Sequence, residues 1–163
     1  MAGGVEIVSG GQTGVDRAAL DTALGLGLRC GGWCPRGRRA EDGTIPARYP
    51  LRETPTAAYP QRTEWNVRDS DGTLILHRGR LRGGTALTLR LARRLRRPAL
   101  AVDLTAAPRA ERVRDWLARE RIARLNVAGP RESEQPGVHA RAAAFLREVL
   151  GALDESGPRS HPS

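Results

Sequence analysis

The chain has 163 residues, which is the usual length of about one domain. Hydrophobic residues make up 39% and charged residues 28%, a balance that excludes a disordered chain, and no apolar run reaches the roughly 18 residues that cross a membrane. The formal net charge is +9, and every basic residue is arginine, so partners that carry negative charge need to be considered.

Short β-rich runs alternate with longer segments of helical periodicity. We expect strands at residues 5–8, 28–34, 73–76, 99–104 and 124–128, an edge strand at 51–54, and helices at 15–26, 59–70, 86–97, 110–122 and 138–153. Because this alternation has no hairpin signal, it predicts one α/β domain over residues 1–153, with a mostly parallel sheet and helices on both faces. Residues 154–163 are expected to be a disordered tail.

The first strand-to-helix loop is rich in glycine and polar side chains. Gly10, Gly11 and Gly14 allow a sharp turn and a close approach of the backbone to a ligand, and Gln12 and Thr13 add donors. Asp16 follows in the first turn of the helix. Ligands of parallel sheets bind beyond the carboxyl ends of the strands, which favours an anion site here over a simple tight turn.

Two later loops occupy equivalent positions after strands. Gly83, Gly84 and Thr85 precede the helix at 86–97, where Thr85 would otherwise act only as a helix cap. Gly129 and Arg131 follow the last strand, and the arginine offers a bidentate fork for a phosphate. We expect all three loops to contribute to one binding site.

Further candidates lie outside these loops. Trp33 and Arg36 suit a flat ring with an anionic group, or alternatively a buried indole beside a solvated basic loop. Asp103 ends a strand and is expected to face the same cleft. Cys30 and Cys34 are read as reduced thiols of a cytoplasmic protein, and no metal site is expected, because zinc requires more ligands than the sequence brings together.

These motifs, taken in order, resemble a known family. The residues are S-G-G-Q-T-G-V-D-R-A-A-L-D at 9–21, the glycine-rich stretch 31–43, R-T-E-W-N-V at 62–67 with S-D-G-T at 70–73, G-G-T at 83–85, and the stretch 126–133. Over residues 5–150 the chain is similar to the molybdenum cofactor carrier proteins of the SLOG superfamily. The resemblance implies a Rossmann-like domain, a molybdopterin or nucleotide-like phosphate ligand over the glycine loops, and a homo-oligomer.

The same superfamily contains phosphoribohydrolases that act on nucleotides, with the signature P-G-G-x-G-T-x-x-E. In this chain the residue three positions after Thr85 is Thr88, where that signature has glutamate. The departure favours a binding or carrier role over catalysis. The alternative is a nucleotide-processing enzyme, with Asp16, Glu64 or Asp103 as the acid or base.

The arginine surplus also permits binding to nucleic acid. However, the arginines are spread over the whole chain, and aromatic residues, which usually accompany them in single-strand binders, make up only 4%. We therefore expect a small anionic ligand and neither nucleic acid nor a membrane as the partner.

Overall fold

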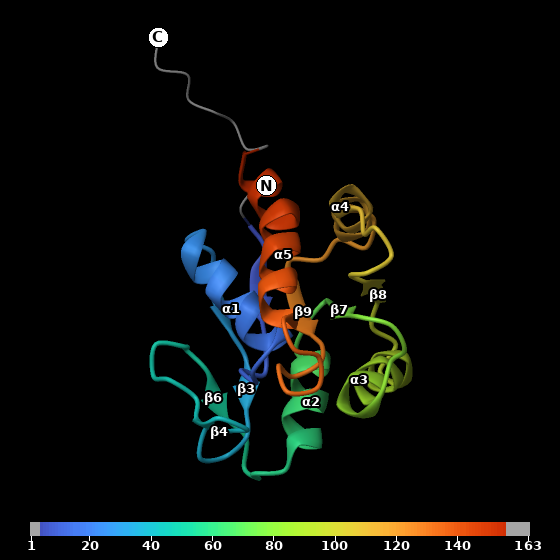
Figure 1. Ribbon diagram of the computed structural model, residues 1–163. Helices are drawn as coiled ribbons and strands as arrows, with labels where there is room; N and C mark the ends of the chain where they lie inside the picture. Colours follow the sequence, from blue (N-terminus) through green and yellow to red (C-terminus); the bar gives the residue numbers. More distant parts are fainter. Residues whose placement is uncertain (1–3, 156–163) are drawn as a thin grey trace.

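The computed structural model describes residues 4–155 and is built around a parallel sheet (Figure 1). Its five strands have the order β2–β1–β9–β7–β8. They comprise β1 Glu6–Val8, β2 Cys30–Gly31, β7 Gly72–His77, β8 Ala99–Asp103 and β9 Arg124–Ala128. Every pairing in this sheet is parallel, as the alternation of strands and helices predicted.

Helices cover both faces of the sheet. Side chains alternate along β7, so that Leu74 and Leu76 join the large core while Thr73 and Ile75 face the other way. The core side carries α1 Val15–Gly25, α4 Ala110–Arg119 and α5 Val138–Glu155, and the opposite side carries the packed pair α2 Tyr59–Arg68 and α3 Gly83–Arg94. This confirms the Rossmann-like three-layer fold.

The connections leave a crevice at the carboxyl ends of the strands. The chain leaves β1 into α1 on one face and leaves β7 into α3 on the other, and β9 lies between these two strands. Where successive connections diverge in this way, the carboxyl ends of the strands face a gap that binds ligands in α/β proteins. The loops singled out in the sequence meet at this gap.

Residues 33–53 form a small lobe beside the sheet, at the lower left of Figure 1. Its strands are β3 Trp33–Cys34, β4 Arg39–Ala40, β5 Gly43–Thr44 and β6 Arg52–Glu53. A second, smaller core lies beneath them, formed by Leu20, Cys34, Ala40, Ile45 and Tyr49. The strands β4 and β5 make an antiparallel hairpin, so the expectation of no hairpin is wrong. The sequence contains a signal for this hairpin, because the turn Glu41-Asp42 is followed directly by Gly43.

The strand expected at residues 28–34 is split in two by Gly32. This residue has φ +132°, and a Cβ atom on it would lie 2.3 Å from the carbonyl oxygen of Ser9. The chain turns here, so that β2 pairs with β1 in the main sheet while β3 pairs with β6 outside it. The expected edge strand at 51–54 therefore belongs to the small lobe.

The helices differ from the expected ones mainly at their ends. Four of them end one to three residues early, at Gly25, Arg68, Arg94 and Arg119. α3 begins at Gly83, three residues early, because the carbonyl of Arg82 accepts the N–H groups of Thr85 and Ala86 and starts the helix there. α5 continues to Glu155 and so includes the first two residues of the predicted tail. The rest of that tail, 156–163, lies outside the described residues. Within residues 4–155 no helix combines the length and apolar character that a membrane span requires.

Candidate functional site

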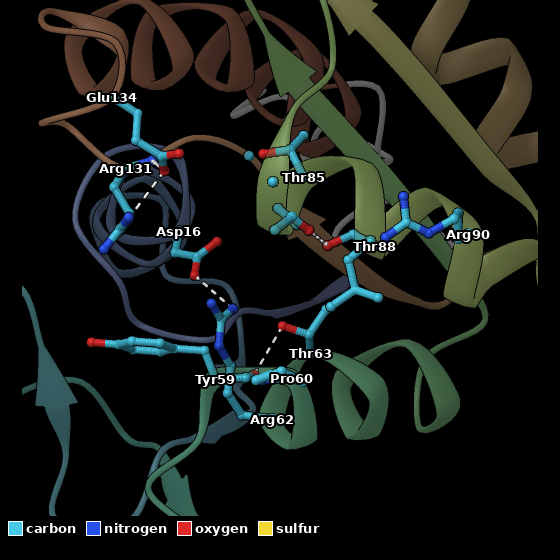
Figure 2. Close-up of a pocket in the computed structure, with 15 residues that line it drawn as sticks. Asp16, Tyr59, Pro60, Arg62, Thr63, Thr85, Thr88, Arg90, Arg131 and Glu134 are labelled. Atoms are coloured by element: carbon cyan, nitrogen blue, oxygen red, sulfur yellow. Dashed lines mark hydrogen bonds and ion pairs between the residues drawn. The ribbon is translucent and has the colours of Figure 1, made fainter.

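A cavity of about 400 Å³ opens at the carboxyl ends of the strands (Figure 2). It lies between α1, α2, the start of α3 and the loop after β9. The residues lining it are Asp16, Tyr59, Pro60, Arg62, Thr63, Gly83, Gly84, Thr85, Leu87, Thr88, Arg90, Ala128, Gly129, Arg131 and Glu134. Six of them, namely Asp16, Gly83, Gly84, Thr85, Gly129 and Arg131, are among the residues expected from the sequence.

The start of α3 presents unpaired backbone donors to this cavity. Thr85 and Ala86 donate their N–H groups to the carbonyl of Arg82, whereas the N–H groups of Gly83 and Gly84 have no hydrogen-bond partner among the described residues. A Cβ atom on Gly84 would meet nothing within 4 Å. The helix dipole adds partial positive charge at this point, so the position suits an anionic group.

Asp16 is the buried carboxylate of the site. Its Oδ2 atom accepts the backbone N–H of Gln12 and lies 3.3 Å from Nη1 of Arg62, while the side chain is only 3% exposed. The Oδ1 atom makes no hydrogen bond within the described part of the chain, and Figure 2 shows it directed into the cavity. Burial raises the pKa of Asp16 to about 6, although Arg62 opposes this shift.

Arginines surround the rest of the cavity. Arg131 places its Nε 3.1 Å from a carboxylate oxygen of Glu134, and Arg90 lies on the opposite wall. Together with Arg62 they give three cationic groups against the two carboxylates of Asp16 and Glu134. The cavity therefore carries a net positive charge when both carboxylates are ionised, and it attracts anions.

The first glycine loop packs mainly against other parts of the chain. A Cβ atom on Gly11 (φ +76°) would lie 2.4 Å from Cδ1 of Leu51, and one on Gly10 would lie 2.4 Å from Nη1 of Arg62. At Gly14 (φ +78°) it would lie 2.3 Å from the carbonyl oxygen of Pro130, which also accepts the N–H of Val15 at 3.2 Å. These glycines are needed for close approach, but the approaching groups belong to the protein.

Neither polar side chain of that loop lines the cavity. Gln12 donates its Nε2 to the carbonyl of Arg39 at 2.9 Å. The hydroxyl of Thr13 donates to Glu41 and accepts the N–H of Glu132. Both side chains thus tie the first loop to neighbouring segments.

Three further candidates lie elsewhere. Trp33 packs edge-on against Trp65, with ring centroids 4.8 Å apart, and donates its indole N–H to Asp69. Arg36 is exposed in the small lobe. The carboxylate of Asp103 accepts the backbone N–H groups of Gly79 and Thr105 and so fixes the turns that follow β7 and β8.

Comparisons with known proteins agree with this geometry. Residues 7–150 match the model of the circularly permutated YpsA SLOG family. The chain belongs to this family. A similar crystal structure is that of "Putative molybdenum carrier protein" from Syntrophus aciditrophicus SB, with 45% identity and a TM-score of 0.85, over 90% of this chain and 94% of that one. No match was found among curated proteins.

In this SLOG domain, sequence reasoning missed the wall that α2 contributes. Tyr59, Arg62 and Thr63 reach the cavity from a helix that begins more than 40 residues after Asp16. One signal was present, because the motif R-T-E-W-N-V at 62–67 contains Arg62 and Thr63. Polar side chains on the inner face of a helix commonly point to a site and not to a core.

Two side chains that line the cavity, Asp16 and Glu134, are of the types that bind a metal ion. Among residues 4–155 no group of three or more histidine, cysteine, aspartate or glutamate side chains is placed to hold one. Cys30 and Cys34 are unpaired thiols, and burial raises the pKa of both. Neither thiol lines the cavity.

Proposed function

We propose that this chain binds a phosphate-bearing small molecule in the cavity, either a molybdenum cofactor or a nucleotide-like ligand. The observation that carries the proposal is the pair of N–H groups of Gly83 and Gly84 at the start of α3, which have no hydrogen-bond partner within residues 4–155. Figure 2 shows Arg131 on one side of the neighbouring Thr85 and Arg90 on the other, and both arginines add positive charge. Backbone donors at a helix start combined with arginine form a common phosphate site.

The remaining cavity wall suits a ring system attached to that phosphate. Tyr59, Pro60 and Leu87 supply apolar surface, and the free Oδ1 atom of Asp16 accepts a hydrogen bond from a ring N–H or a hydroxyl. Molybdopterin fits this donor and acceptor set through its phosphate and pterin ring, and it holds molybdenum by its own sulfur atoms. The carrier name of the Syntrophus protein supports this choice of ligand.

A nucleotide hydrolase is the second candidate. Asp16 favours it, because a buried carboxyl with a pKa of about 6 that faces a cavity suits acid or base catalysis. Against it, the position of the superfamily's glutamate is occupied by Thr88, whose hydroxyl donates to the carbonyl of Gly84 at 2.8 Å. We therefore favour binding.

We also infer a cytoplasmic location and self-association. The unpaired thiols of Cys30 and Cys34 support the first. Self-association follows from the family resemblance, and size-exclusion chromatography with light scattering tests it.

The experiment places a competing carboxylate in the cavity. Gly84→Glu adds one at a helix position with free space, where an acidic residue is compatible with the helix. Gly84→Gln controls for size, and Gly25→Glu, with nothing within 4 Å, controls for net charge. Affinity for AMP and for inorganic phosphate is measured by calorimetry, and native mass spectrometry detects a ligand retained on purification.

We expect Gly84→Glu to weaken phosphate binding at least about tenfold, Gly84→Gln to weaken it less, and Gly25→Glu to leave it unchanged. Equal affinities of Gly84→Glu and the original protein, with both folded by circular dichroism, would contradict the proposal. So would the absence of binding for both probes.

A further inference from the structure

The carboxylate of Glu41 is enclosed by hydrogen-bond donors from two distant loops. Glu41 lies in the turn of the β4–β5 hairpin. Its oxygens accept the hydroxyl groups of Thr13 and Ser133, and Oε1 also accepts the backbone N–H of Ser133 at 3.3 Å. Nη1 of Arg131 lies 3.9 Å from Oε2. Glu41 as a whole residue is exposed in this surface turn, and its side chain is 21% exposed.

This donor set is the kind that surrounds a bound oxyanion. Two hydroxyls, one backbone N–H and one guanidinium converge on a single anionic group, and each of them also suits a phosphate oxygen. Partial loss of water opposes ionisation of Glu41, yet the hydrogen bonds from Ser133 and Thr13 hold its pKa below the ordinary range. The donors therefore stabilise negative charge at this point.

The loops that carry the donors also have hydrogen bonds that do not involve Glu41. Thr13 also accepts the backbone N–H of Glu132 at 3.1 Å, and Arg131 is held through its Nε by Glu134. The hairpin has its own anchors, since Arg17 pairs with Asp42 and Gln12 donates to the carbonyl of Arg39. Glu41 can therefore leave while the two loops and the hairpin keep their connections.

We propose that Thr13, Ser133 and Arg131 form an oxyanion site beside the cavity, and that Glu41 is its internal occupant, displaced when a phosphate-type anion binds. The site goes beyond the cavity at the start of α3, because Thr13, Ser133 and Glu41 do not line that cavity. Arg131 borders both, so the anion is either free or a second phosphate of the cavity's ligand.

Removal of Glu41 tests this site. Calorimetry with inorganic phosphate at fixed ionic strength compares the original protein, Glu41→Ala and the double variant Glu41→Ala/Ser133→Ala. Glu111→Ala on α4 is the matched control, because it removes the same charge from an exposed position far along the chain. Hydrogen exchange of residues 39–44 verifies that the hairpin remains formed.

We expect Glu41→Ala either to bind one more phosphate than the original protein or to bind phosphate at least about tenfold more tightly. The reason is that the donors no longer have an internal partner. Adding Ser133→Ala should reverse most of this gain, and Glu111→Ala should show none. If Glu41→Ala binds ADP more tightly than AMP, the anion at the oxyanion site is a second phosphate of the cavity's ligand. A separate phosphate site with equal ADP and AMP affinities would identify a free anion.

Unchanged phosphate binding in Glu41→Ala would overturn the site, and so would a gain of the same size in Glu111→Ala. The added variant Gly84→Glu separates the two proposals. In the background of Glu41→Ala it blocks the cavity and should leave one phosphate bound at the oxyanion site. If Glu41→Ala binds phosphate and the original protein does not, the result contradicts the proposed phosphate site in the cavity and supports the oxyanion site.

Discussion

Asp16 engages Arg62 through one carboxylate oxygen, Oδ2, and leaves Oδ1 free to face the cavity. The pair joins α1 to α2, two helices on opposite faces of the sheet. Because the carboxylate is buried and only partly compensated, its charge can change near neutral pH, and with it the charge of the cavity.

The first prediction concerns the pH dependence of anion binding. Asp16 is mostly ionised at pH 7.5 and protonated at pH 5, since its pKa is about 6. Loss of this negative charge leaves Arg62 free to attract the ligand, so sulfate affinity should rise several-fold as the pH falls through 6. Sulfate is the probe because its own charge is constant over this range, and calorimetry is the measurement.

Asp16→Asn is the matched variant for that prediction. It should bind sulfate at pH 7.5 about as tightly as the original protein does at pH 5, and its affinity should vary little between the two. A pH profile identical in both proteins would assign the effect to another group.

The same carboxyl affects stability in a defined direction. The folded-state pKa of about 6 lies above the ordinary value of 3.8, so the folded state binds the proton more tightly. The stabilisation from this proton is complete below pH 3.8 and is lost as the pH rises through 6. Urea unfolding at pH 5 and pH 7.5 should show this loss in the original protein and not in Asp16→Asn.

A third prediction concerns Gly11. Gly11 has a φ of +76°, and a Cβ atom on it would lie 2.4 Å from Cδ1 of Leu51. The change Gly11→Ala therefore strains the backbone and displaces a packed side chain. Gly27 has a similar φ of +71° but open space around it, so Gly27→Ala measures the backbone strain alone. Chemical unfolding should show that Gly11→Ala costs ~1–3 kcal/mol more than Gly27→Ala. Equal costs would mean that Leu51 moves aside freely.

A fourth prediction separates a carrier from a hydrolase. With Thr88 in place of the superfamily's glutamate, we expect no release of free base from nucleoside monophosphates above the uncatalysed rate, as followed by chromatography. Turnover on the order of 1 per second would make the chain an enzyme. Loss of that turnover in Asp16→Asn would then identify the acid.

The last prediction addresses the excess of arginine. Arg93 and Arg94 are exposed on α3 and do not line the cavity. We expect only weak nucleic-acid binding that vanishes by ~0.2 M salt, and the double change Arg93→Glu/Arg94→Glu should leave affinity for inorganic phosphate unchanged. A dissociation constant near ~10 nM in a fluorescence anisotropy titration at ~0.15 M salt would show specific nucleic-acid binding instead.

Local patterns predicted the sheet and six of the fifteen residues that line the cavity. The apolar run of β7 and the glycines before α3 are recognisable within a few residues, and the parallel fold determines where their ends meet. Tyr59 has no such local signal, because it reaches the cavity through the packing of α2 against α3. That contact depends on the whole fold.

The glycines of the first loop show a different limit. The sequence predicted that Gly11 and Gly14 allow the backbone to approach a ligand closely, and both residues have positive φ. Spacing alone does not distinguish a ligand from another segment of the same chain. The structure places Leu51 beside Gly11 and the carbonyl of Pro130 beside Gly14.

The contact between Gly14 and Pro130 also determines how this region opens. The N–H of Val15 bonds to the carbonyl of Pro130, and the N–H of Glu132 bonds to the hydroxyl of Thr13, so the loops after β1 and β9 are linked twice. Neither loop can detach without breaking the other's hydrogen bonds. We therefore expect the two segments, more than 100 residues apart in the chain, to open as one unit, with amide protons that exchange with solvent together.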